Sequence, residues 1–243
     1  MARYKLILTY DGTRFHGSQR QLNVRTVQGV VEDALWKLGW TGTSVLMAGR
    51  TDAGVHAVGQ VVAFDFDWNH LEVELLKALN ALLPEDVAVS QAEVIHDDFH
   101  PRYHARSRGY QYCIYMQASR NPMLERYAWR VWPVPEIRIL QATADHLKGV
   151  HDFAAFGNPM QPDGNTIREL ISASWKQTGE MLYFDVQANA FLYHMVRRLV
   201  SSQIKLAQGW MDMQQLLNYL HRPEAQIQGL APPQGLTLVS VHY

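Results

Sequence analysis

The segment at residues 48–57, AGRTDAGVHA, places one carboxylate, Asp52, two residues after one guanidinium, Arg50. A positive charge this close keeps a carboxylate ionised at neutral pH, which suits a nucleophile better than a general acid. Gly49 and Gly54 let the backbone bend and approach a ligand closely. The alternative is a turn in which Asp52 accepts hydrogen bonds from local backbone amides. The residues alone leave both interpretations open.

Two stretches of the chain contain arginines but no acidic residue, residues 12–31 and residues 99–124. In the second stretch histidines and tyrosines are interleaved with the arginines, a mixture that suits phosphate contacts and base stacking. The alternative is a pair of solvated loops whose acidic partners lie elsewhere in the sequence. The candidate phosphate contacts are Arg14, Arg20, Arg25, Arg102, Arg106 and Arg108.

The histidines and the single cysteine do not form a recognisable metal site. Cys113 has no second cysteine with which to form a disulfide or a Cys/His zinc site of the usual spacing. His100 and His104 are four residues apart, but Pro101 lies between them in a predicted loop. We therefore expect no bound metal.

Hydrophobic periodicity in the first half of the chain predicts the order β-α-β-β-α-β. Tyr4, Leu6 and Leu8 alternate with other residues as in a strand, Thr26 can cap the first helix, and Pro84 stops the second. The predicted strands are 3–10, 44–48, 60–66 and 87–94, and the predicted helices are 27–38 and 75–83.

The second half shows the same order, which predicts an α+β fold of two ferredoxin-like halves with antiparallel sheets joined around a central cleft. We place the halves at residues 1–98, which include the Asp52 segment, and at residues 99–243. The RRM, an RNA-binding module, has this topology, but many proteins with this fold bind no RNA. The predicted strands are 109–116, 167–176, 181–188 and 236–243, and the predicted helices are 137–147, 191–207 and 212–221.

The bulk composition is that of a folded globular protein. The chain has 243 residues, of which 47% are hydrophobic and 19% charged, and this permits one large domain or two small ones. The net charge of −1 argues against a globally basic nucleic-acid binder. We find no apolar run typical of a signal peptide or of a membrane span, and a single cysteine fits a reducing compartment. We therefore expect a cytoplasmic protein.

The string GRTDAGVHA closely resembles the signature loop of the tRNA pseudouridine synthase I family, also called the TruA family. Four further motifs resemble those of the family in the right order, so that the resemblance covers almost the whole chain. These motifs are YDGTRFHGSQ at 10–19, ARSRGYQYCI at 105–114, FLYHMVRRLVS at 191–201 and APPQGLTLVSVHY at 231–243.

The resemblance implies a role for each matching residue. Asp52 matches the catalytic aspartate, and Arg50 matches the arginine of the same loop. Tyr110 matches a tyrosine that contacts the target base, Arg197 matches the arginine that pairs with the aspartate, and Leu238 matches an apolar residue that lines the pocket. The residues themselves leave alternatives, because Tyr110 alternates with other apolar residues on one strand face and is also a candidate for the core. Arg197 and its neighbour Arg198 point about 100° apart on a helix, so only one of them is expected to face the site.

The activity that the resemblance implies is the isomerisation of uridine to pseudouridine at tRNA positions 38, 39 and 40 in the anticodon stem-loop. The target base is expected to flip out of its stack, and the aspartate then attacks either C6 of the base or the sugar, the latter through a glycal. No cofactor or metal is required. The family also implies a homodimer that binds tRNA, with Arg14, Gln19, Arg106 and Arg108 as candidate substrate contacts. The competing hypotheses are a related synthase with other target positions and an RNA-binding module without activity.

One residue departs from the family pattern. The family usually has tryptophan after the glycine of its first motif, whereas this chain has Ser18. We expect this loss of a large ring to change the packing or an RNA contact and not to involve the catalytic residues. On this interpretation Ser18→Trp changes the affinity for RNA more than the rate of the reaction.

Overall fold

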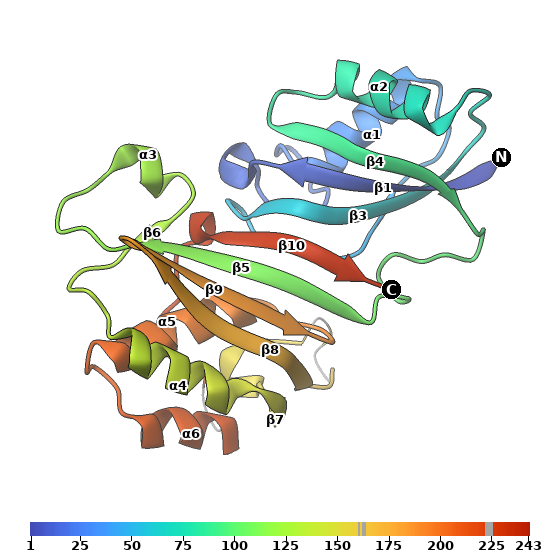
Figure 1. The fold of residues 1–243 in the computed structure, drawn as a ribbon. Helices are drawn as coiled ribbons and strands as arrows, with labels where there is room; N and C mark the ends of the chain where they lie inside the picture. Colours follow the sequence, from blue (N-terminus) through green and yellow to red (C-terminus); the bar gives the residue numbers. More distant parts are fainter. Residues whose placement is uncertain (160, 162–163, 222–225) are drawn as a thin grey trace. The chain divides into compact units, whose positions relative to one another are not determined.

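The computed structural model describes residues 1–159, 161, 164–221 and 226–243, and it divides into two compact units. Unit 1 consists of Met1–Arg106 together with Thr237–Tyr243, and unit 2 consists of Ser107–Leu236. Each unit combines helices with a sheet (Figure 1), so that the α+β class is confirmed. These units differ from the expected halves in two respects. The boundary lies after Arg106 and not after residue 98, and most of the closing strand belongs to unit 1 because it pairs there with another strand.

Unit 1 has the element order that the periodicity predicts. In its sheet β4 pairs with β1, β1 with β3, and β3 with β2, and every one of these pairs is antiparallel. The last strand, β10, runs parallel to the start of β3. The strands are β1 (Ala2–Tyr10), β2 (Leu46–Met47), β3 (His56–Phe66), β4 (Val87–Ile95) and β10 (Leu236–His242).

The helices α1 (Val27–Lys37) and α2 (Glu72–Leu82) lie on one side of this sheet (Figure 1). Thr26 caps α1 as predicted, since its hydroxyl accepts a hydrogen bond from the Gly29 N–H at 3.3 Å. Leu6 and Leu8 of β1 are fully buried, which confirms the alternation of that strand. A short 3-10 helix, η1 (Gly12–Arg14), follows β1.

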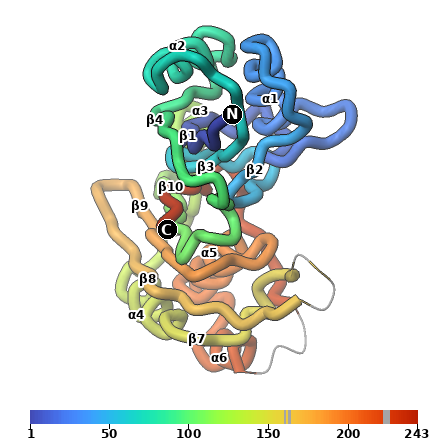
Figure 2. The backbone as a smooth tube through the Cα atoms, turned by 90° about the vertical axis from the view of Figure 1, so that its right-hand side faces the viewer, coloured from blue at the N-terminus to red at the C-terminus, as the bar shows by residue number. Residues whose placement is uncertain are grey.

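The sheet of unit 2 is also antiparallel, in the order β5-β9-β8-β7, and the short β6 runs parallel to β5. Helix α4 packs against β8 and α5, and α6 lies beside β7 (Figure 2). The strands are β5 (Ser107–Tyr115), β6 (Trp129–Arg130), β7 (Gly149–Asp152), β8 (Ile167–Thr178) and β9 (Met181–Ala188). The helices are α3 (Pro122–Glu125), α4 (Ile137–Leu147), α5 (Met195–Ala207) and α6 (Met213–His221), with 3-10 turns η2 (Ala154–Phe156) and η3 (Pro233–Gly235).

Three short elements of unit 2, α3, β6 and β7, were not predicted, because two to four residues show no periodicity of their own. Helix α5 begins four residues later than the predicted range, since His194 has a left-handed backbone with φ of 66°. Within the described ranges, no helix is long and apolar enough to cross a membrane.

Candidate active site

The predicted catalytic segment is a loop between β2 and β3 of unit 1. Asp52 is half-buried in this loop and Arg50 is exposed, whereas Thr51 between them is buried. Thr51 thus points into the unit, whereas its two charged neighbours lie nearer to solvent. The backbone next to Asp52 is held by the contacts of Thr51.

Each polar atom of Thr51 has a partner. Its N–H donates to Ser18 Oγ at 2.8 Å, and its carbonyl accepts from the Ser18 N–H at 3.0 Å. Its hydroxyl shares a hydrogen bond of 2.8 Å with the hydroxyl of Tyr10 at the end of β1. These three bonds fasten the residue before Asp52 to two separate segments of unit 1.

The loop is also fastened on either side of Thr51. The buried amide of Gln60 in β3 accepts from the Gly49 N–H at 3.3 Å and donates to the Gly49 carbonyl at 2.9 Å. On the other side, the Gly54 N–H donates to the Phe15 carbonyl at 3.3 Å. Asp52 is therefore bracketed by fixed backbone although the loop has no regular secondary structure.

Gly17 shows how closely the two loops approach one another. Its φ is +93°, which side chains rarely tolerate, and an added Cβ would lie 2.9 Å from the Thr51 carbonyl oxygen. Glycine at this position therefore allows Ser18, the next residue, to reach Thr51.

Tyr10 anchors Thr51 through its hydroxyl. Burial raises the pKa of Tyr10 to about 12, and the hydrogen bonds with Thr51 and Gln60 oppose this only in part. The hydroxyl thus remains protonated at neutral pH, where it holds Thr51.

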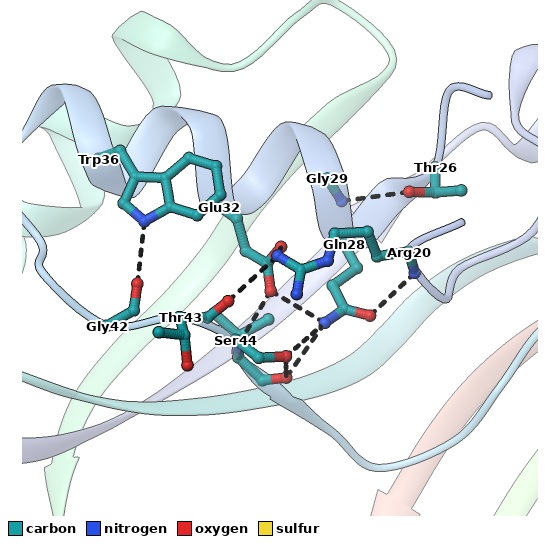
Figure 3. Close-up of polar contacts among 10 residues, drawn as sticks. Arg20, Thr26, Gln28, Gly29, Glu32, Trp36, Gly42, Thr43 and Ser44 are labelled. Carbon is teal, nitrogen blue, oxygen red and sulfur yellow. Dashed lines mark hydrogen bonds and ion pairs between the residues drawn. The ribbon is translucent and has the colours of Figure 1, made fainter. Parts of the chain in front are cut away.

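The arginines of the first acid-free stretch are paired with acids that are distant in sequence. Arg25 donates to both oxygens of Asp86 at 2.7 Å, and Arg14 lies 3.5 Å from Glu85. Arg20 donates at 2.8 Å to Glu32, a contact that Figure 3 shows. Although residues 12–31 contain no acidic residue, acidic side chains from other segments lie next to these arginines in the folded chain.

The second acid-free stretch differs from the first. Arg106 is exposed, and within the described part of the chain no carboxylate forms an ion pair with it. Arg108 in β5 is partly exposed and donates to the Asn189 carbonyl at 3.2 Å. Tyr103 is 75% exposed, and Arg102 lies over its ring at 5.8 Å. This stretch therefore offers both guanidinium groups and an aromatic face to solvent.

Two of the proposed pocket residues lie in strands. Leu238 of β10 is fully buried and pairs with Ala57, which follows the end of the Asp52 loop in β3. Tyr110 of β5 is 9% exposed and meets the ring of Phe191 edge to face, with ring centroids 5.1 Å apart. Tyr112, two residues along the same strand, is fully buried. Tyr110 thus lies on the core face of β5 and keeps a small exposed area.

The two neighbouring arginines of α5 in unit 2 bind different segments. Arg197 Nε donates to the Ala231 carbonyl at 2.7 Å, whereas Arg198 donates to the Gln226 side chain at 3.0 Å. This difference in partners agrees with the helical geometry, which points the side chains of adjacent residues in different directions. Burial raises the pKa of Tyr112 well above its usual value, and the charge of Arg197 opposes that shift.

Of the proposed catalytic residues, Asp52 and Arg50 belong to unit 1, and Arg197 belongs to unit 2.

The two histidines considered as metal ligands contact backbone amides. The His100 N–H donates to His104 Nδ1 at 3.3 Å, and the Arg102 N–H donates to His100 Nδ1 at 3.1 Å. Among the residues that the structure describes, no group of three or more His, Cys, Asp or Glu side chains could hold a metal ion.

The contacts by which Tyr10, Ser18 and Gln60 hold the Asp52 loop were not predicted from the sequence. For Ser18 the structure favours a change in packing over a change in an RNA contact, because its side chain is fully buried against Thr51. The role of Gln60 could have been suspected from the sequence, since it is the one amide in the otherwise largely apolar strand His56–Phe66. The sequence does not indicate the roles of Ser18 and Tyr10, because their partner, Thr51, lies more than thirty residues away.

The chain resembles known proteins along its full length. Residues 6–104 and 143–243 match the profile of a family described as tRNA pseudouridine synthase. A tRNA pseudouridine synthase A of Streptococcus equi subsp. equi is 39% identical, over 100% of this chain and 99% of that protein. A tRNA pseudouridine synthase A 2 of Bacillus cereus is 34% identical, over 100% of both chains.

The Arg25–Asp86 pair gives unit 1 a stability that depends on pH. Hydrogen bonds from Arg25 lower the pKa of Asp86 below its usual value. The stabilisation is therefore present above the unfolded pKa of about 3.9 and is lost as the pH falls through the lower folded value. We predict that Asp86→Asn lowers the free energy of unfolding at pH 7 by about 1–2 kcal/mol, and that this difference shrinks towards pH 2.

The measurement is urea unfolding between pH 7 and pH 2. Asp33→Asn is the control, because Asp33 is exposed on α1. A constant difference between Asp86→Asn and the unchanged protein over this whole range would contradict the role given to the pair.

Proposed function

Because the chain belongs to the tRNA pseudouridine synthase family, we propose that Asp52 is the nucleophile with which it converts uridine to pseudouridine in tRNA. The protein is thus an isomerase that acts on tRNA. One observation carries the assignment of Asp52: the residue before it is held by three hydrogen bonds, while Asp52 itself keeps exposed area. A carboxylate on backbone that is fixed in this way suits attack on a bound substrate better than the local capping of a turn.

The reaction breaks the bond from ribose C1′ to N1 of uracil and forms a bond from C1′ to C5. The hydrogen on C5 leaves, and N1 gains a proton, so that the overall change is an isomerisation. The Asp52 carboxylate serves both routes, addition to C6 of the base and reaction at the sugar. The balanced equation needs neither an oxidant nor water.

The remaining roles follow from the family resemblance. We assign Arg197 as the partner of the catalytic carboxylate, Tyr110 as the residue that stacks on the flipped base, and Leu238 as part of the apolar lining. The proposed tRNA contacts are Arg14, Gln19, Arg106 and Arg108, all of them at least partly exposed.

We propose uridines 38, 39 and 40 of the anticodon stem-loop as targets, a homodimer as the active form and the cytoplasm as the location. A related synthase with other target positions would show pseudouridine elsewhere when the modified tRNA is sequenced. Light scattering of the purified protein with and without tRNA tests the dimer.

We predict that Asp52→Asn abolishes turnover and leaves tRNA binding intact. The amide has nearly the shape of the carboxylate but is neutral and a very poor nucleophile. The paired measurements are the affinity for tRNA by gel shift and the release of tritium from C5 of uracil in the same tRNA. Asp67→Asn is the matched control, because it removes one negative charge from a residue of unit 1 whose side chain is 79% exposed.

Two results would redirect the assignment. Near-normal tritium release by Asp52→Asn would move the search to another acid. Tight tRNA binding by the unchanged protein without tritium release from any tRNA would favour an RNA-binding module without activity.

We predict that tRNA affinity falls steeply with salt despite the net charge of −1, and that Arg106→Ala reduces the slope. Each lost phosphate contact lowers the slope of log affinity against log salt by about 0.7–0.9. Arg138→Ala, which removes an exposed arginine of α4, is the control and should leave the slope unchanged. Equal slopes for the two variants would show that Arg106 is an ordinary solvated side chain.

We predict that EDTA leaves the activity intact, because the chemistry balances without a Lewis acid or a redox step. The assay is tritium release in buffer with monovalent salt that keeps the tRNA folded. Loss of turnover that zinc restores would contradict this prediction.

A further inference from the structure

Ser18 contacts both peptide groups that flank Thr51. Its hydroxyl accepts from the Thr51 N–H at 2.8 Å, which fixes the peptide group between Arg50 and Thr51. Its own N–H donates to the Thr51 carbonyl at 3.0 Å, which fixes the peptide group between Thr51 and Asp52. One residue thus sets the orientation of the backbone on both sides of Thr51, and the second of these peptide groups contains the backbone nitrogen of Asp52.

We propose that Ser18 is a positioning residue for the reaction, and that its hydroxyl aims the Asp52 carboxylate by holding the Thr51 amide. This inference rests on the proposed role of Asp52. Ser18 touches neither substrate nor reacting atoms, since it is fully buried. It acts through Thr51, so that its removal should slow the chemical step and not weaken the binding of tRNA.

Ser18 is itself held by the rigid part of unit 1. Its carbonyl accepts from the Gln28 N–H at 2.9 Å in the first turn of α1. The Gln28 side chain accepts from the Arg20 N–H at 2.9 Å and donates to Glu32 at 2.9 Å (Figure 3). Glu32 is fully buried and also accepts from the Val45 N–H at 2.9 Å. A network of buried polar contacts thus joins helix α1 to Ser18, and Ser18 joins it to the catalytic loop.

The hydroxyl bond cannot be replaced within the loop by the contacts that remain. Tyr10 holds the Thr51 side chain and Gln60 holds Gly49, but neither of these bonds uses the Thr51 N–H. Without Ser18 Oγ this amide would be left in a buried place without its acceptor, and such a group drives the backbone to rotate towards another partner. A displacement of about 1 Å in a reacting group can lower a rate about 100-fold.

The test measures the single-turnover rate at saturating tRNA and, separately, the dissociation constant for tRNA. We expect Ser18→Ala to lower the saturated rate about 10-fold to 100-fold and to change the dissociation constant less than about 2-fold. Ser18→Cys should behave as Ser18→Ala does, since a thiol has nearly the same shape but is a weak acceptor. Thermal unfolding by circular dichroism shows whether each variant is folded.

Thr26→Ala is the matched control. Thr26 is also a buried hydroxyl of unit 1 that accepts from a backbone N–H, but its partner, Gly29, lies in α1 and not in the catalytic loop. We expect it to lower the melting temperature while the saturated rate stays within about 2-fold of the unchanged protein. An equal loss of rate in Thr26→Ala would overturn the proposal, because the effect would then be one of general stability.

Amide hydrogen exchange of residues 48–57 supplies a readout that does not depend on activity. Ser18→Ala should speed exchange at Thr51 at least about 10-fold, and Thr26→Ala should not. A saturated rate within 2-fold of the unchanged protein in Ser18→Ala would overturn the proposal, and so would a loss confined to tRNA affinity. These outcomes differ from those that would contradict the proposed function. In that case tritium release would persist in Asp52→Asn or would be absent from the unchanged protein.

Discussion

The fixed position of Thr51 is the constraint on which the proposed chemistry depends. A carboxylate accelerates a reaction only when it is aimed, and a loop without regular secondary structure does not aim a side chain by itself. Here Ser18, Tyr10 and Gln60 supply from their own segments the partners that a strand or helix would otherwise provide. Buried Thr51 thus fixes the loop backbone, whereas its neighbour Asp52 is only half-buried.

The arginines also divide into those that fasten the backbone and those that are exposed to solvent. In unit 1 the ion pairs of Arg20 with Glu32 and of Arg25 with Asp86 fasten the segment that carries Ser18 to α1 and to the start of β4. Arg25 also stacks over Phe15 at 4.0 Å, and the Phe15 carbonyl in turn holds Gly54 of the catalytic loop. These arginines therefore position the backbone. We propose that exposed guanidinium groups such as that of Arg106 attract tRNA, so that a chain of net charge −1 can bind a polyanion.

Much of the fold could be predicted from the sequence because it depends on local periodicity. The alternation of Tyr4, Leu6 and Leu8 and the capping of α1 by Thr26 are both present. With four residues, β7 is too short to show a hydrophobic period. Helix α5 begins only after His194 because this residue has a left-handed backbone, which its residue type does not predict. The loop contacts escaped prediction for a different reason. Ser18 and Thr51 are 33 residues apart, and Arg25 and Asp86 are 61 apart, so that only the folded chain brings them together. The pairing of Arg25 with Asp86 and the burial of Ser18 against Thr51 therefore escaped prediction.

We propose that this protein isomerises uridine in tRNA without any other component, through the carboxylate of Asp52 in this loop. The most direct measurement is a nucleoside balance, in which unmodified tRNA is incubated with the purified protein, digested completely and analysed for uridine and pseudouridine. The account predicts that each uridine lost is matched by one pseudouridine gained, without any added component. An unchanged uridine content in tRNA that the protein binds tightly would contradict it.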